Sequence, residues 1–139
     1  MNQLIISRRF DFSASHRYYR DDWSVEKNHS VFGLCALPNG HGHNYTLDVS
    51  VAGIPDPSTG MVINLVELKS IVDRILEEFD HKHLNLDTPY FHERIPTTEN
   101  LVIVLWDLIN SHLPDSRLSH LRLYETDDLF VDYYGDQEC

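Results

Sequence analysis

The chain has 139 residues, of which 42% are hydrophobic, and we expect one globular domain over residues 1–139. Eleven Lys and Arg residues against 22 Asp and Glu residues give a formal net charge of -11. A chain with this charge should repel nucleic acid and anionic membranes, so an anionic substrate has to be met by a local cluster of cations or by a metal.

The segments that direct a protein to a membrane or an oxidising compartment are not recognisable here. The N-terminal stretch MNQLIISRRFDF has too short an apolar run for a signal peptide, and no later stretch approaches the roughly 20 apolar residues of a membrane span. We therefore expect a cytoplasmic protein. Cys35 and Cys139 are the only cysteines, and because Cys139 is the terminal residue, we expect Cys35 to be a free thiol.

Two strands are predicted in the first part of the chain. Residues 4–16 alternate between apolar and polar side chains, as a half-buried strand requires, and His16 ends the apolar parity. Residues 17–40 are polar and irregular and end in Pro-Asn-Gly, which predicts a long loop, and a loop of that length in a small domain is usually functional. A second alternation begins at Tyr45 and predicts a strand antiparallel to the first.

Two helices follow a turn at residues 55–60. Asn64 with Glu67 three residues later marks a helix start, and apolar residues recur at helical spacing over 65–79. Pro96-Thr97-Thr98-Glu99 opens a second helix, which Pro114 ends. A hairpin with its turn after Thr126 completes the order ββααββ.

Three of the nine histidines point to a metal site. His41 and His43 are two residues apart on the apolar parity of an extended chain, so both rings project to one side. An isolated His-x-His is a weak signal, but His16 also ends the apolar parity of the neighbouring strand. Three imidazoles at one end of a two-stranded unit suit a tetrahedral Zn²⁺ whose fourth position is open to substrate or water, which indicates catalysis.

A second His-x-His pair, His81 and His83, is an alternative ligand set. It follows a helix end, where residues two apart diverge, which argues against it. Asp80 with His81 is typical of a polarised acid–base pair, although both residues could simply complete the helix C-terminus. Cys35 is either a small buried apolar residue or a reactive thiol, whose pKa a nearby Zn²⁺ or imidazolium would lower.

Glu125 is a carboxylate on the apolar parity that Leu121 and Leu123 define. A buried carboxylate is costly unless something pairs with it. An arginine would be a structural partner. The alternative is a ligand, because a carboxylate in a pocket can accept two hydrogen bonds from the N–H and NH₂ edge shared by guanine and pterins.

Together these residues resemble the 6-pyruvoyltetrahydropterin synthase family over nearly the whole chain. The motifs that carry the resemblance are FSASHR (12–17), C-x5-HGHNY (35–45), TGMVINLVELK (59–69), FDHKHLN (79–85), PTTEN (96–100) and YET (124–126). The resemblance implies an α+β tunnelling fold (T-fold), a four-stranded antiparallel sheet with two helices on one face. It also implies a homohexamer, a dimer of trimers, with active sites between subunits.

The resemblance also implies roles for single residues. His16, His41 and His43 match the zinc ligands, and Cys35 matches the catalytic cysteine. The residues that match the proton relay are Asp80 and His81, and those that match the pterin site are Glu125, Thr97 and Thr98. One departure from bacterial relatives that make 6-carboxytetrahydropterin is Asn64, where many of them carry aspartate, and their cysteine stands closer to the His-x-His pair.

Three functions are therefore weighed. The first is a zinc lyase that converts 7,8-dihydroneopterin triphosphate to 6-pyruvoyltetrahydropterin by eliminating triphosphate, and the spacing from Cys35 to His41 resembles this branch. The second is 6-carboxytetrahydropterin synthase, with the same substrate and metal. The third is a non-catalytic pterin-binding protein with structural zinc, against which the absence of a fourth protein ligand counts. No Gly-x-Gly-x-x-Gly motif is present to hold a nicotinamide cofactor.

Overall fold

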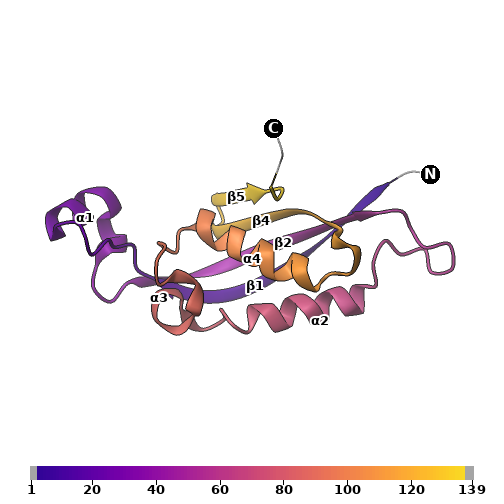
Figure 1. Cartoon of the computed structure of the whole chain (residues 1–139), viewed down its shortest axis with the longest axis horizontal. Helices are drawn as coiled ribbons and strands as arrows, with labels where there is room; N and C mark the ends of the chain where they lie inside the picture. Colours follow the sequence, from indigo (N-terminus) through magenta and orange to yellow (C-terminus); the bar gives the residue numbers. More distant parts are fainter. Residues whose placement is uncertain (1–2, 137–139) are drawn as a thin grey trace.

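The computed structural model describes residues 3–136, which form one sheet covered by helices on one face (Figure 1). The strands are β1 (Leu4–His16), β2 (His41–Gly53), β3 (Lys82–His83), β4 (Leu118–Thr126) and β5 (Leu129–Tyr133), in the spatial order β3-β1-β2-β4-β5. Four of them form the predicted antiparallel sheet. The difference from the prediction is β3, two residues long, which pairs in parallel with β1.

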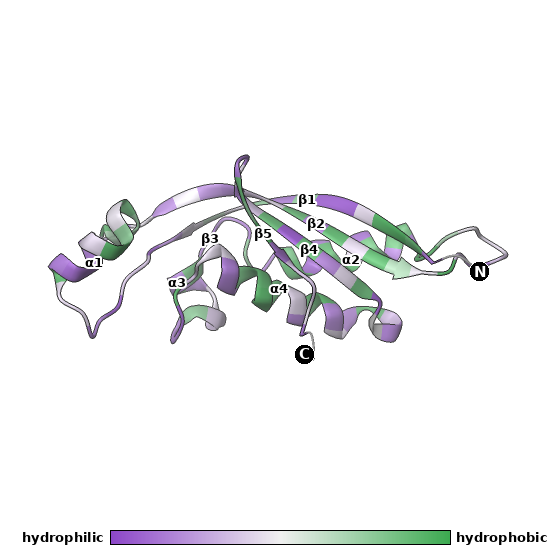
Figure 2. Ribbon diagram, turned by 90° about the horizontal axis from the view of Figure 1, so that it is seen from above, coloured by the Kyte–Doolittle hydropathy of each residue, from purple (hydrophilic) through white to green (hydrophobic). Residues whose placement is uncertain are grey.

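The alternating apolar and polar residues of the sequence lie on opposite faces of the sheet. β1 and β2 pair in register along their whole length, from Leu4 opposite Gly53 to His16 opposite His41. β2 therefore begins at His41, four residues before the alternation predicted. The apolar parity of both strands, which includes Phe12 and Leu47, is buried, and Figure 2 shows this alternation of polar and apolar residues along the strands.

Helices α2 (Leu65–Leu76) and α4 (Thr98–His112) lie against the buried face of the sheet, as predicted (Figures 1 and 2). Both begin at side-chain caps: Asn64 accepts hydrogen bonds from the backbone of the first turn of α2, and Thr97 accepts from Asn100 N. Helix α2 ends at Leu76 and not at residue 79, and Phe79 enters the core from the turn that follows.

Residues 17–40 are not the irregular loop that was predicted, because they contain helix α1 (Val25–Phe32) and a 3-10 turn, η1 (Gly33–Ala36). Ser24 caps α1, and the buried Asn28 donates to three backbone carbonyls of the preceding turn. Figure 1 shows α1 protruding beyond the sheet. Because this helix does not pack on the sheet, its sequence lacks the apolar stripe that marks α2.

Short elements connect the sheet and the helices: α3 (Leu84–Asp87), η2 (Pro89–Phe91) and η3 (Pro114–Ser116). Within residues 3–136, none of the helices has the length and apolar character needed to cross a membrane. Cys35 forms no disulfide in this part of the chain, and Cys139 lies outside the described residues.

Candidate active site

The strand register brings His16, His41 and His43 together. His16 lies opposite His41 and Ala14 opposite His43, so the three rings share one face at the end of the β1–β2 pair. One nitrogen from each ring lies within 4.8 Å of those of the other two, and the Nε2 atoms of His16 and His41 are 3.3 Å apart. Among residues 3–136 this is the single group of three or more possible metal ligands of that compactness.

A glycine makes this arrangement possible. Gly40 has a φ of 66°, which a residue with a side chain rarely adopts, and a Cβ at this position would collide with the carbonyl oxygen of His16. The chain can therefore turn into β2 directly beside the end of β1. Without that close approach His41 would not face His16.

Burial keeps His16 and His43 neutral. His16 is fully buried, and burial, followed by the neighbouring His43 and His41, lowers the pKa of His16 to about 3. Burial also lowers the pKa of His43, although Glu125 acts in the opposite direction. Neutral imidazoles are the form that binds metals, so His16 and His43 present nitrogen lone pairs at neutral pH.

Tyr45 orients the cluster, a role that the sequence did not reveal. Its hydroxyl lies 2.9 Å from Nδ1 of His16, and its ring stacks on Phe12 at 5.0 Å between centroids. Burial raises the pKa of Tyr45, so the hydroxyl stays protonated. The bond to Nδ1 leaves Nε2 of His16 directed at the other two histidines. The one feature of the sequence that could have indicated this role is that Tyr45 lies on the same parity of the strand as His43.

Glu125 is buried beside the histidines and has no arginine partner among the described residues. Its Oε2 accepts a hydrogen bond of 3.1 Å from the hydroxyl of Thr98, and its Oε1 lies 2.9 Å from Nε2 of His43 and 3.5 Å from Nε2 of His16. The contact with His43 lacks hydrogen-bond geometry, so Nε2 of His43 is buried with no hydrogen bond within residues 3–136. A buried nitrogen without a partner is what a missing metal ion would leave.

Cys35 lies next to the cluster. Its Sγ is 3.7 Å from Nε2 of His41, and its carbonyl accepts a hydrogen bond of 2.8 Å from Tyr18 N. Burial, and then the charge of Glu125, raise the pKa of the thiol. The thiolate therefore needs a positive charge nearby to form at neutral pH.

Asp80 and His81 do not join Cys35 within the chain. Asp80 accepts a hydrogen bond of 2.8 Å from Ser13 N and pairs with Nδ1 of His81 at 3.0 Å. The side chain of His81 is 83% exposed, and its φ of 60° is a conformation that costs a non-glycine residue on the order of 1–3 kcal/mol. Such strain often occurs at functional sites.

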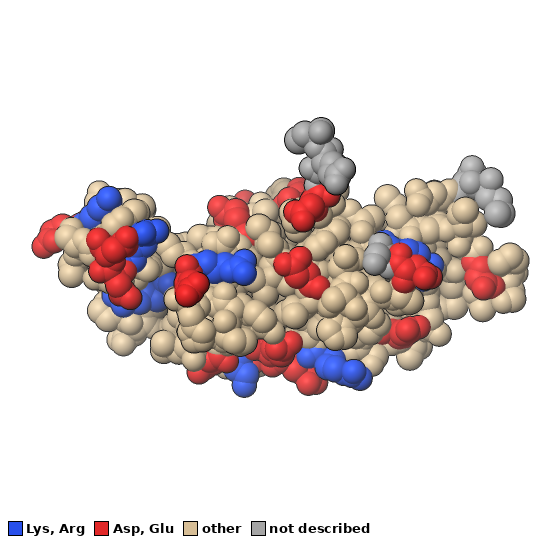
Figure 3. Space-filling view, in the orientation of Figure 1, with Lys and Arg blue, Asp and Glu red and all other residues tan. Residues whose placement is uncertain are grey.

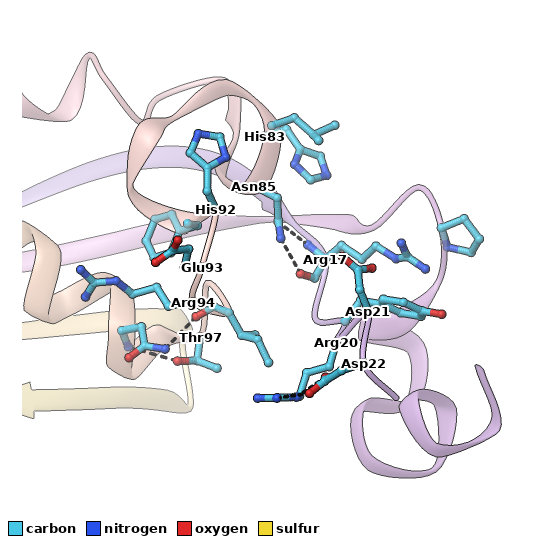
Figure 4. Close-up of a pocket in the computed structure, with 16 residues that line it drawn as sticks. Arg17, Arg20, Asp21, Asp22, His83, Asn85, His92, Glu93, Arg94 and Thr97 are labelled. Carbon is cyan, nitrogen blue, oxygen red and sulfur yellow. Dashed lines mark hydrogen bonds and ion pairs between the residues drawn. The ribbon is translucent and has the colours of Figure 1, made fainter. Parts of the chain in front are cut away.

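Within residues 3–136, the alternative ligand pair forms no compact group with a third possible metal ligand. His83 lies on β3 beside Ser15, whereas His81 points to solvent, as residues two apart at a helix end were expected to do. Nδ1 of His83 is nonetheless buried with no hydrogen bond among the described residues. His83 lines a cleft of about 860 Å³ together with Arg17, Asn85 and Thr97 (Figure 4).

Comparisons with known proteins place the chain in a family. The sequence pattern of the family described as 6-pyruvoyl tetrahydropterin synthase matches residues 5–136. The 6-pyruvoyl tetrahydrobiopterin synthases of Homo sapiens and Pongo abelii are each 47% identical over 135 residues, which cover 96% of this chain and 93% of theirs. The structure of Caenorhabditis elegans 6-pyruvoyl tetrahydropterin synthase superposes with a TM-score of 0.94 and 33% identity, covering 98% of both chains.

Each of these matches covers more than nine-tenths of this chain and of the matched protein. The fold, with its sheet and two covering helices, is the one that the motifs imply. The chain therefore belongs to the 6-pyruvoyl tetrahydropterin synthase family.

Proposed function

We propose that this protein converts 7,8-dihydroneopterin triphosphate to 6-pyruvoyltetrahydropterin, with elimination of triphosphate, and that it uses a zinc ion held by His16, His41 and His43. Family membership makes the chain an enzyme, a carbon–oxygen lyase acting on phosphates. The observation that carries the proposal is the compact group of three imidazoles directly beside a buried carboxylate and a thiol.

The donor set fits zinc. Three imidazoles are typical of catalytic zinc, and within residues 3–136 the compact group has no fourth member. The buried Nε2 of His43, which has no hydrogen bond in this part of the chain, supports a metal between the rings. When bound, zinc supplies a Lewis acid that polarises the oxygens of the substrate side chain. Tyr45 would fix the tautomer of His16 by accepting the Nδ1 proton.

Cys35 is proposed as the base. The proton transfers require a group that removes hydrogen from carbon atoms of the substrate side chain, and Sγ stands at the edge of the histidine cluster. Its pKa is raised in the absence of a cation, so the proposal requires that a bound metal lower it again. Rearrangement of electrons within the substrate needs no external nicotinamide.

Glu125 is proposed to anchor the pterin ring. It is buried and ends β4 with Thr98 as its hydroxyl donor, so it can accept the N–H and NH₂ edge of a pterin. Thr97, which caps α4 and lines the adjacent cleft, is assigned to the same pocket. Glu125 would then orient the substrate side chain toward the three histidines, since its other oxygen already faces His43.

We further propose that Asp80 and His81 relay protons to Cys35 of a neighbouring copy in a homohexamer. The exposure of His81 and its separation from Cys35 in the chain support a site shared between subunits. The exposed residues at the ends of β1 and on β5, such as Ile5 and Phe130, support assembly through the sheet edges. Light scattering of the purified protein tests the hexamer, and a monomer would contradict it.

Product analysis tests the reaction. The zinc-loaded protein, incubated with 7,8-dihydroneopterin triphosphate, is expected to release triphosphate and give 6-pyruvoyltetrahydropterin, trapped as a biopterin by a reductase. Acetaldehyde with 6-carboxytetrahydropterin as the main product would establish the second function instead. Pterin binding with intact zinc and no turnover would establish the non-catalytic one.

Metal analysis tests the ligands. His41→Ala and His43→Ala are expected to lose most of the zinc that the wild-type protein holds, at about one ion per chain. The matched controls are His81→Ala and His83→Ala, which should keep it. Full zinc in both of the first variants, with loss in the controls, would move the metal to the alternative pair.

A further inference from the structure

The cleft beside the histidines begins where β1 ends. Arg17, which directly follows the buried His16, lies on its wall with His83, whereas Thr97, assigned above to the pterin, lines the other side of the cleft at the start of α4 (Figure 4). The cleft has a volume of about 860 Å³, toward the upper end of the range for small-molecule sites. It therefore offers space for a part of the substrate that extends past the histidines.

Arg17 is held in place but keeps donors free. The side-chain amide of Asn85 forms two hydrogen bonds with the backbone of Arg17. It accepts from Arg17 N at 2.8 Å and donates to the Arg17 carbonyl at 2.9 Å. The side chain donates from Nε to the carbonyl of Ala36 at 3.1 Å and stacks on the ring of Tyr19 at 3.9 Å. Its two terminal amino groups have no partner within residues 3–136, so a fixed guanidinium presents free N–H donors.

The other arginine on the same wall is already neutralised. Arg20 forms two hydrogen bonds with Asp22, of 2.9 and 2.6 Å. Arg94 lies on the opposite wall without an ion pair in the described part of the chain, and Figure 4 shows it at the far side from Arg17. The acidic residues that also line the cleft are Asp21, Asp22 and Glu93.

In a chain with this excess of acidic residues, an arginine without an ion pair is a candidate for binding an anion. The chain has a net charge of -11, and Figure 3 shows Asp and Glu in separate patches over the visible face, with several of the Lys and Arg side chains toward the end that carries α1. Arg17, at the base of that end, makes no ion pair among residues 3–136. An anion that enters the cleft would meet a guanidinium without a competing carboxylate partner.

We propose that Arg17, positioned by Asn85, binds the triphosphate tail of the substrate in this cleft. This assignment rests on the proposed function. Glu125 faces His43 and His16 from β4, whereas Arg17 directly follows His16 and lies on the wall of the cleft, an arrangement that suits a substrate whose pterin and triphosphate lie at opposite ends of a short side chain.

The test measures binding of the anion directly. Isothermal titration calorimetry of the zinc-loaded protein with the magnesium salt of inorganic triphosphate is expected to detect binding. Arg17→Gln should weaken it about 10- to 100-fold, the loss of a charge-assisted hydrogen-bonded pair. Metal analysis of the recovered protein shows whether triphosphate has removed the zinc, and only samples that keep it are compared.

Two controls separate Arg17 from charge in general. Arg74→Gln removes one exposed positive charge from α2, and the double variant Arg20→Gln/Asp22→Asn removes the neutral pair within the cleft; both should bind triphosphate as the wild type does. Asn85→Ala should weaken triphosphate binding while leaving the affinity for phosphate-free 7,8-dihydroneopterin unchanged. A purely structural role of Asn85 would lower both affinities together.

The outcomes distinguish this assignment from the proposed reaction. Triphosphate binding that depends on Arg17 in a protein that does not turn over the substrate would support the cleft and refute the reaction. Normal turnover with an unchanged KM and triphosphate affinity in Arg17→Gln would overturn the role of Arg17. Absence of triphosphate binding by the wild-type protein would overturn it as well.

Discussion

The hydroxyl of Tyr45 offers the sharpest test of the proposed metal site. It is the polar group within 2.9 Å of Nδ1 of His16, and both side chains are fully buried. Tyr45→Phe removes this hydroxyl and leaves the ring, so the stacking on Phe12 is retained. The change therefore isolates one hydrogen bond that lies outside the metal-binding nitrogens.

The structure sets the size of the expected effect. If Nε2 of His16 binds zinc, Nδ1 carries the proton, and without the hydroxyl this buried N–H has no acceptor. A buried donor without a partner costs about 1–3 kcal/mol, which is the expected loss in the free energy of unfolding. Loss of an outer partner of a zinc-bound histidine costs about 10- to 100-fold in metal affinity, or about 1.4–2.7 kcal/mol.

Two measurements check this prediction. Competition with a chromophoric chelator gives the zinc affinity, and urea unfolding of the zinc-loaded protein gives the stability. Tyr90→Phe is the matched control, because Tyr90 also stacks on a phenylalanine, Phe79, and bonds through its hydroxyl, but to the exposed Glu78. It should cost less than about 1 kcal/mol and leave zinc affinity unchanged. Equal zinc affinity in Tyr45→Phe and the wild type would refute the reasoning.

Further variants test the residues around the metal. Cys35→Ala should keep zinc and lose turnover roughly 10²- to 10⁴-fold, measured as triphosphate release; a wild-type rate would make Cys35 a packing residue. Glu125→Gln should weaken pterin binding by about 1–3 kcal/mol in a fluorescence titration, because a donor replaces an acceptor, and equal affinity would exclude the anchor. His81→Asn should lose turnover without a lower melting temperature, since Asn tolerates a φ of 60°; retained turnover argues against the relay. The Ser13 N–H, and less strongly His81, lower the pKa of Asp80 below its ordinary 3.8, so its stabilisation is present above that pH and is lost as the pH falls through the folded value. Asp80→Asn should accordingly flatten the decline of stability in acid urea unfolding, and an unchanged decline would contradict this.

Local patterns in the sequence were sufficient for most of the fold. The alternation over residues 4–16 predicted β1 with its bounds, and the caps at Asn64 and Thr97 predicted where α2 and α4 begin. These predictions succeeded because a strand or helix that packs on the core records its buried face in its own periodicity. Helix α1 was missed for the same reason, since it does not pack on the sheet and its order depends on the local bonds of Asn28.

What the sequence determined by itself was that His16, His41, His43 and Glu125 lie on buried parities, because side-chain direction in a strand follows from position alone. Only the tertiary structure decided the register that places His16 opposite His41 and the contact of the Tyr45 hydroxyl with Nδ1 of His16. It also decided that Oε1 of Glu125, which is far along the chain, lies 2.9 Å from Nε2 of His43. Within residues 3–136 it shows no contact of Cys35 with Asp80 or His81. Distances between elements depend on register and packing between segments remote in sequence, and no local period encodes them.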